Sequence, residues 1–166
     1  QVMTAGLSRY VPFSVSGQMG ADPYDFRSGF NAGISFCEDT RPEGYPREML
    51  RAAIAEGKRI RKYYSGNLYA LTDVTTSPKD WCVLQYHRST EGDGMVVAFR
   101  RHQSPYTGFT CALREIDANA NYQVTVSPGY APHPETTMKG ADLVNVVLDI
   151  DKAPDSVLLE YRLVSK

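Results

Sequence analysis

The feature that most constrains the fold of this chain is a change of hydrophobic pattern near residue 66. Beyond it, apolar side chains recur at every second position, as where Tyr122, Val124 and Val126 alternate with Gln123 and Thr125. Because successive side chains of a β-strand point to opposite faces, this period predicts strands rather than helices. We expect strands within residues 81–88, 94–101, 109–114, 122–126, 144–150 and 157–163.

The number and spacing of these segments predict two facing sheets. The residues Glu91-Gly92-Asp93-Gly94 separate the first two segments and are typical of a hairpin turn. Short strands with turn residues between them are typical of an antiparallel sandwich. A single sheet would leave one apolar face in water, so a second sheet has to cover it. We therefore predict a mainly β protein in which residues 67–166 form an antiparallel β-sandwich domain.

The first 66 residues have a mixed α/β pattern. A helix is expected over residues 46–64, where apolar residues recur three and four positions apart and Pro46 suits the first helical position. The compact apolar run at residues 33–37 is typical of a fully buried parallel strand, although its length alone does not separate it from a buried helix. Residues 26–32 predict a short helix. Residues 8–14 are β-prone and are interpreted as a strand or extended segment.

The composition excludes several classes of partner. Eighteen basic and nineteen acidic residues nearly cancel, so the chain has neither the basic field that binds nucleic acid nor a polybasic stretch for anionic lipid. No apolar run approaches the roughly 20 residues of a membrane helix. We predict no nucleic-acid partner and no membrane partner. Residues 1–4 do not resemble a signal peptide, and we interpret them as an internal point of a longer chain, so the sequence indicates no compartment.

The sequence also lacks the usual patterns for metals and cofactors. The cysteines are too widely spaced for a disulfide framework or a zinc site. Cys82 and Cys111 lie in apolar alternations and are interpreted as buried side chains, with a bridge between them as the alternative. No Gly-rich phosphate loop, His-Glu-x-x-His motif or nucleophile elbow is present, so we predict no cofactor and no metal. The isolated histidines are interpreted as surface or hairpin residues rather than ligands or bases: His87, His102 and His133.

Carboxylates near the predicted parallel strand are the best acidic candidates. Glu38 and Asp39 follow the apolar run, where a barrel strand delivers side chains to its active face, and Asp22 and Asp25 precede it. A retaining glycosidase needs two carboxylates about 5–5.5 Å apart. Adjacent strand residues point to opposite faces, so Glu38 and Asp39 cannot be that pair by themselves. A solvated loop is therefore the preferred interpretation over catalysis, and substrate contact remains as a role.

Aromatic residues are numerous, with eleven Tyr, six Phe and one Trp, and flat aromatic rings can stack on sugar rings. Most of these rings lie in the strand alternations, where packing in a core is the simpler interpretation. Tyr106 and Tyr130 lie in predicted loops. They are therefore the better candidates for exposed contacts with carbohydrate.

A series of short segments spans most of the chain in an order typical of one enzyme family. In the N-terminal half these are YVPFS at 10–14, DPYDFRS at 22–28 and RIRKYYSGNLYALT at 59–72. In the C-terminal half they are Trp81, QYHR at 85–88, GMVVAFRR at 94–101, SPY at 104–106 and KGADL at 139–143. In this order and spacing they resemble the bacterial α-galactosidase-like proteins of the melibiase group, in glycoside hydrolase family 36.

This resemblance implies a retaining α-glycosidase whose catalytic barrel precedes an accessory sandwich. On that basis residues 1–66 are the terminal strands and last helix of an incomplete (β/α)8 barrel, and residues 67–166 are the accessory domain. The catalytic aspartates of the family lie on earlier barrel strands, so no catalytic residue is assigned to this chain. The resemblance leaves three candidates for substrate contact in the parent protein: Asp22, Arg27 and Asp39.

Three hypotheses for function follow. In the leading one, the chain alone is inactive and its partner is the catalytic barrel of a parent that hydrolyses terminal α-galactosides or a related α-glycoside. The alternatives are an independent carbohydrate-binding module and a structural or interaction domain. Two barrel strands and one helix cannot close a barrel, so we expect their apolar faces to pack on the sandwich, to self-associate or to become disordered.

Overall fold

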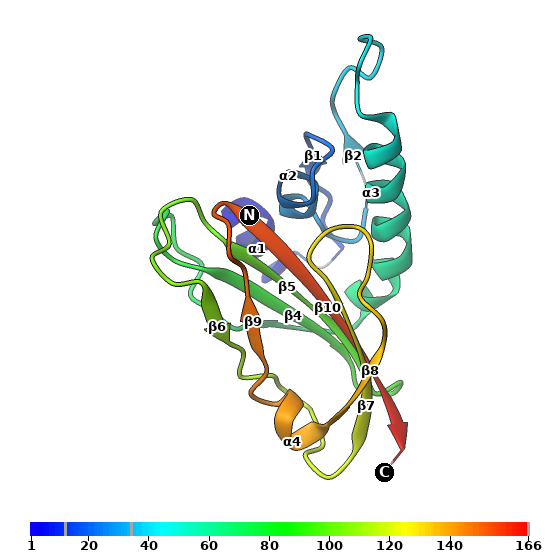
Figure 1. Ribbon diagram of the computed structural model, residues 1–166, viewed down its shortest axis with the longest axis vertical. Coiled ribbons are helices and arrows are strands. Elements are labelled where there is room, and N and C mark those ends of the chain that lie inside the picture. The colour runs from blue at the N-terminus through cyan, green and yellow to red at the C-terminus, as the bar shows by residue number, and fades with distance from the viewer. Residues whose placement is uncertain (12, 34, 166) are drawn as a thin grey trace.

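The computed structural model describes residues 1–11, 13–33 and 35–165, and a six-stranded antiparallel sheet lies at its centre (Figure 1). The strand order is β3-β4-β5-β10-β7-β8. The strands are β3 (Asn67–Ala70), β4 (Cys82–Arg88), β5 (Asp93–Arg100), β7 (Asn121–Ser127), β8 (Thr136–Lys139) and β10 (Asp155–Ser165). The sheet confirms the antiparallel β structure that the alternating pattern predicted for this part of the chain.

The hairpin between β4 and β5 forms where the turn residues predicted it. Gly92 has a φ of 65°, a left-handed conformation that glycine adopts without steric cost. Arg88 and Asp93 face each other across the hairpin and are joined by two hydrogen bonds of 2.8 and 2.7 Å. All eight residues of β5 are buried, because the strand lies inside the sheet and both faces of the sheet are covered.

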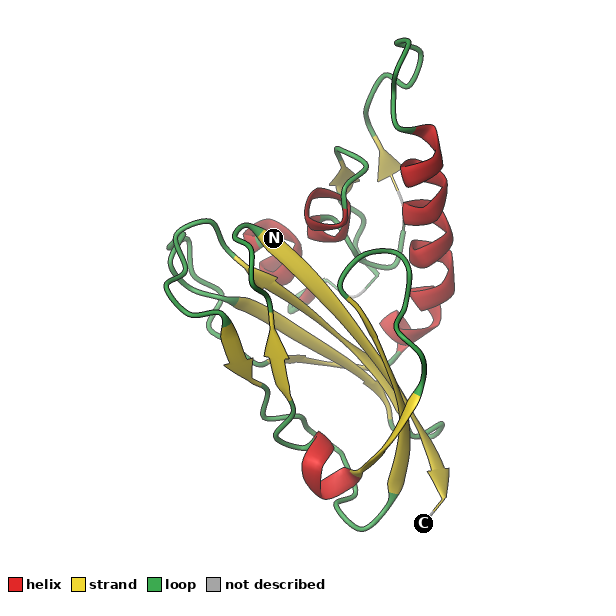
Figure 2. Ribbon diagram, viewed as in Figure 1, coloured by secondary structure: helices red, strands yellow, loops and turns green. Residues whose placement is uncertain are grey.

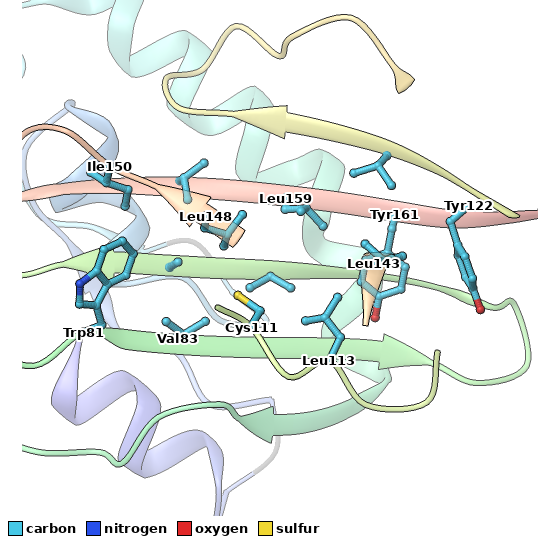
Figure 3. Packing of buried hydrophobic residues seen from close by; sticks show 14 of the residues in the cluster. Trp81, Val83, Cys111, Leu113, Tyr122, Leu143, Leu148, Ile150, Leu159 and Tyr161 are labelled. Carbon is cyan, nitrogen blue, oxygen red and sulfur yellow. The ribbon is translucent and has the colours of Figure 1, made fainter. Parts of the chain in front are cut away.

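A smaller layer covers one face of the sheet. It consists of the antiparallel pair β6 (Gly108–Thr110) and β9 (Val147–Asp149) and the short helix α4 (Gly140–Leu143). Figure 3 shows the resulting core, in which Val83 and Leu159 of the sheet, and Trp81 directly before β4, pack with three residues of the smaller layer and its flanking segments, namely Cys111, Leu113 and Leu148. The predicted sandwich is therefore present, with one large and one small sheet.

The N-terminal part of the chain covers the opposite face of the sheet, and we call it the N-terminal layer (Figure 2). Its buried side chains, among them Phe26, Ala53 and Ile60, pack with Leu84 and Val97 of the sheet. Its elements are α1 (Val2–Ser8), β1 (Gly17–Gln18), α2 (Pro23–Ser28), β2 (Ser35–Phe36), α3 (Arg47–Ile60) and the 3-10 helix η1 (Arg61–Ser65). Of the three outcomes expected for this part, packing on the sandwich is the one that the structure shows.

Three details of the N-terminal layer differ from the expectations. The segment predicted as a strand over 8–14 begins as the last residue of α1 and continues as a turn, with residue 12 outside the described residues. The short helix begins at Pro23 rather than at residue 26, because Asp22 caps it there. The parallel strand of the run 33–37 is present as β2, paired with β1, but Ser35 and Phe36 are only partly buried, so the expectation of a buried strand is wrong. Residue 34 lies outside the described residues.

The alternative of a bridge between Cys82 and Cys111 is wrong. Both thiols are free and buried, but Cys82 packs against the N-terminal layer and Cys111 packs in the core on the other face. The sheet itself therefore separates them. Within the described parts of the chain, no helix has the length and apolarity needed to cross a bilayer.

Candidate functional site

The parallel pair β1 and β2 brings acidic residues together at one end. Gly17 pairs with Ser35 and Gln18 pairs with Phe36, so both strands run into their following loops at the same edge. Ligands of α/β proteins bind outside the carboxyl ends of parallel strands. Asp22 and Asp25 follow β1 there, and Glu38 and Asp39 follow β2.

Asp22 has a defined local role at the start of α2. Its Oδ1 accepts hydrogen bonds from the backbone amides of Tyr24 at 3.0 Å and Asp25 at 3.1 Å. These amides are among those that a helix N-terminus leaves without a partner, and Pro23 follows at a position where no amide is needed. The carboxylate therefore fixes the start of α2 at the edge where the acidic residues meet.

Asp22, Asp25 and Glu38 form what we call the acidic cluster. Partial burial raises the pKa of Asp25, and the hydrogen bond and charge of Asp22 and the charge of Glu38 raise it further. Glu38 Oε2 accepts hydrogen bonds from the Gly20 amide at 3.2 Å and from the Tyr45 hydroxyl at 2.8 Å. Like charges near one another favour the protonated form of a carboxyl group, which is the direction of the effect on Asp25.

Gly20 makes the close approach of the two loops possible. Its φ is 73°, and a Cβ atom at this position would lie 2.9 Å from Oδ2 of Asp25. A side chain would therefore be strained in its backbone and would also displace the carboxylate. The arrangement of the acidic cluster therefore depends on a glycine at this position in the loop after β1.

Asp39 is hydrogen-bonded to Arg41 rather than to a member of the acidic cluster. It is exposed and accepts two side-chain hydrogen bonds from Arg41, of 2.9 and 3.0 Å. These bonds to the guanidinium, with one from the Arg41 backbone amide, lower the pKa of Asp39. The carboxylate is thus ionised and open to solvent at the end of β2.

Arg27 is placed differently from the two aspartates, because it is 1% exposed. Its Nε and one terminal nitrogen donate to the carboxylate of Glu56 at 2.7 and 2.8 Å. The guanidinium also donates to the backbone carbonyl and hydroxyl of Ser156 at 3.1 and 3.3 Å and to the carbonyl of Gly129 at 2.8 Å. The side chain therefore joins α2 to α3 and to β10 through acceptors of this chain, and the structure does not bring it together with Asp22 and Asp39.

The loop tyrosines also differ from each other. Tyr106 is 72% exposed, as expected for a candidate contact residue. Tyr130 is half-buried, and its hydroxyl donates to the carbonyl of Ala21 at 2.8 Å while the guanidinium of Arg27 lies 5.8 Å from its ring centre. Tyr130 thus packs against the N-terminal layer, and the interpretation of an exposed contact is wrong for it.

His87 lies in the β4–β5 hairpin, one of the two interpretations, but it is buried and not on the surface, whereas His102 and His133 are exposed. The Nδ1 atom of His87 lies 2.9 Å from the hydroxyl of Tyr161, which also accepts a hydrogen bond of 2.7 Å from Gln85. Burial lowers the pKa of His87, against the opposing charge of Glu115. Only the position of Gln85 and His87 on one face of β4 could have indicated this polar group in the core.

The described residues contain no group of three or more histidine, cysteine or acidic side chains arranged to hold a metal ion. What this end of the N-terminal layer offers is a set of exposed or partly exposed carboxylates beside a short parallel pair of strands. Such an edge can accept hydrogen bonds from hydroxyl groups.

Comparison with solved structures places the fold. No family model matches the chain, and neither does any curated protein. The galactosidase domain of the α-galactosidase-sucrose kinase AgaSK aligns with 98% of this chain, at 13% identity and a TM-score of 0.69. The GH36 α-galactosidases AgaA and AgaB from Geobacillus stearothermophilus each align with 84% of it, at 15% and 16% identity and TM-scores of 0.63 and 0.60.

The chain spans only part of these proteins, namely 24% of the length of the first and 19% of the other two. At such identities the likeness is one of fold, and it extends over both the sandwich and the N-terminal layer in the first comparison. The resemblance expected from the short sequence segments is therefore confirmed at this level. The chain has the fold of one part of the GH36 α-galactosidases, a mainly β structure built on an antiparallel six-stranded sheet.

Proposed function

We propose that this chain is the C-terminal part of a retaining, α-galactosidase-like glycosidase and that it has no activity alone. In this proposal, residues 67–166 are an accessory domain and residues 1–66 are the end of the catalytic barrel. The observation that carries the proposal is the exposed apolar surface of the N-terminal layer.

Large apolar side chains are exposed mainly in this layer. Three of those described lie elsewhere, namely Tyr106, Val147 and Val164. Eight lie within residues 1–49: Met3, Leu7, Tyr10, Val11, Phe13, Val15, Met19 and Met49. Large exposed apolar surfaces mark contacts with other parts of a protein or with partners. The occupant that we propose is the remainder of a barrel in the same longer chain.

The parallel pair β1 and β2 supports the same partner. Parallel strands occur almost only in larger sheets that are covered on both faces, whereas this pair has two residues in each strand. Further parallel strands of a barrel would extend it. The solved structures that share the fold are four to five times longer than the part that this chain matches, which leaves room for such a barrel.

Within the assembled barrel, we propose that Asp22 and Asp39 contact the substrate from the carboxyl ends of β1 and β2. Asp39 is exposed and Asp22 is partly exposed, and the position of both after the two parallel strands supports this role. Arg27, which was the third candidate, would act by holding α2 in place, because its donors are engaged within this chain.

An assay of the isolated chain with a chromogenic α-galactoside tests the proposal. We expect no hydrolysis above the blank, because the reactive carboxylates belong to the rest of the barrel. The longer protein that contains this chain should be active, and Asp39→Asn in that protein should lower its activity. Turnover by the isolated chain that is abolished by Asp22→Asn or Asp39→Asn would overturn the proposal.

A further inference from the structure

A second surface with the chemistry of a binding site lies on the other side of the sheet from the N-terminal layer. It is an open groove of about 470 Å³ beside the start of β4. The segment between β3 and β4 and the segment between β5 and β6 form its walls. Its lining residues are Leu71, Thr72, Asp73, Thr75, Lys79, Asp80, Trp81, Tyr106 and Phe109.

The floor of this groove is a fixed aromatic surface. Trp81 stacks on Phe109, with ring centres 5.6 Å apart and ring planes inclined by 24°. Figure 3 shows Trp81 at one end of the core, and Phe109 packs against that core while remaining partly exposed. The two rings are therefore held by the packing of the sandwich, and part of the Phe109 surface is left open to a ligand.

Tyr106 also lines the groove, and it is exposed although its backbone carbonyl is hydrogen-bonded to Trp81. The indole Nε1 of Trp81 donates a hydrogen bond of 3.2 Å to the carbonyl of Tyr106. Tyr106 is nevertheless 72% exposed as a residue, so the structure holds its backbone carbonyl without burying the residue. An exposed ring on a held backbone presents an apolar face at a low entropic cost of binding.

The rim of the groove carries polar groups on the segment between β3 and β4, whose backbone is bound by Arg101. Buried Arg101 donates to the carbonyls of Thr75 at 2.8 Å and Ser77 at 2.7 Å. On the same segment, the hydroxyl of Thr75 donates to Asp80 at 2.7 Å. Asp73 on this rim is exposed. The rim therefore offers carboxylate oxygens as acceptors in a preorganised arrangement.

This combination of groups matches the two faces of a sugar ring. The C–H face of a pyranose carries partial positive charge and stacks on the negative face of an aromatic ring. The hydroxyl groups at the edge of the sugar donate to carboxylates, and such bonds to a charged acceptor are strong. The groove has Asp73 and Asp80 against the single cation of Lys79, which disfavours an anionic ligand. We propose that this groove binds a neutral oligosaccharide, independently of whether the chain completes a catalytic barrel.

The single tryptophan of the chain makes the proposal directly testable. The indole N–H of Trp81 gives one resolved signal in a nitrogen–proton correlation spectrum, and its hydrogen bond to Tyr106 makes that signal sensitive to the groove. The chain is titrated with raffinose, and in parallel with maltotriose and cellotriose as neutral trisaccharides of other linkages. We expect at least one of them to shift the indole signal in a saturable manner.

Matched variants identify the groove as the site. Tyr106→Ala should weaken binding by roughly tenfold or more, because the stacking face is lost, while Tyr106→Phe should retain it. Tyr10→Ala removes a tyrosine that is 80% exposed in the N-terminal layer and should leave binding unchanged. The proposal is overturned if none of the three sugars shifts the indole signal, or if Tyr106→Ala binds them as well as the unmodified chain does.

Discussion

Arg27 and Glu56 show, at the scale of single residues, how a charged pair can hold three elements together. Both side chains are at most 1% exposed, and the guanidinium also bonds the backbone of β10. The sequence placed Arg27 in a recognisable segment, but it could not indicate this role. The reason is that its partners are 29 and 129 residues away, and only the folded chain brings them together.

Arg27→Ala should lower the free energy of unfolding by about 3–5 kcal/mol, because the carboxylate of Glu56 would be left buried without a partner. Replacing both residues, as Arg27→Met with Glu56→Leu, should restore part of the loss. Arg41→Ala, which removes an exposed ion pair with Asp39, serves as the control and should cost nothing measurable. Urea unfolding measures all of them, and an Arg27→Ala variant as stable as the control would contradict the role.

His87 should make the stability of the chain depend on pH. Burial lowers its pKa in the folded state, whereas the unfolded chain has the ordinary value of about 6.5. The unfolded state therefore binds the proton more tightly, and the stability present above about pH 6.5 is lost as the pH falls toward the folded-state pKa.

The measurement is the free energy of unfolding at several pH values between about 7.5 and 5, with His87→Gln as the variant. We expect this variant to show a smaller loss on acidification than the unmodified chain. His102→Gln, at an exposed position, should follow the unmodified chain. Equal pH profiles for the chain and His87→Gln would show that His87 does not carry the effect.

At the scale of elements, prediction from sequence worked where one face of an element is apolar. The helix expected over 46–64 corresponds to α3 and η1, and the alternating segments correspond to β4, β5, β7 and β10. The segments 109–114 and 144–150 form only short strands, yet the amides of Cys111 and Leu113 still bond the carbonyls of Val146 and Val144 at 2.9 Å. Their alternation thus reflects pairing that continues beyond the regular ladder.

The N-terminal layer was harder to predict because apolar residues in its sequence are not always the residues that it buries. The β-prone residues Tyr10 and Val11 follow α1 in a turn and are exposed, so they do not mark the buried face of a strand. The acidic cluster could be anticipated only in part. Glu38 and Asp39 follow an apolar run, but the pairing of β1 with β2 that brings Asp22 and Asp25 nearby involves two residues in each strand and has no periodic signal.

The junction of β8 and α4 depends on Gly140. A Cβ atom there would lie 1.9 Å from the carbonyl oxygen of Asp117, a backbone atom that cannot easily move. The Gly140 amide also donates to the carbonyl of Ala120 at 2.8 Å, which fixes the approach. Gly140→Ala should therefore destabilise the chain by about 1–3 kcal/mol.

Thermal unfolding compares this variant with Gly129→Ala as its control. At Gly129 a Cβ atom would meet nothing within 4 Å, and the carbonyl that accepts from Arg27 is retained. We expect the control to unfold close to the unmodified chain. If the two glycine variants unfold at the same temperature, the close contact at Gly140 does not limit the fold.

At the scale of the whole molecule, the exposed apolar side chains of the N-terminal layer should make the isolated chain self-associate. Size-exclusion chromatography with light scattering should show a mass that rises with concentration. Replacing Met3, Tyr10 and Met19 by Ser should reduce the association, since each is more than 60% exposed. Tyr106→Ser, at an equally open position outside this layer, should not. A monomer at every concentration would contradict the expectation.

The position of β10 has a consequence for how the molecule is made. It pairs with β5 on one side and with β7 on the other, so it joins the two halves of the sheet, β3-β4-β5 and β7-β8. Yet it follows every other described strand in the chain. During synthesis on the ribosome, β3-β4-β5 and β7-β8 emerge as two separate fragments with open edges. The central sheet therefore cannot be completed until β10 has been synthesised. Until then, both fragments expose strand edges that chaperones can bind.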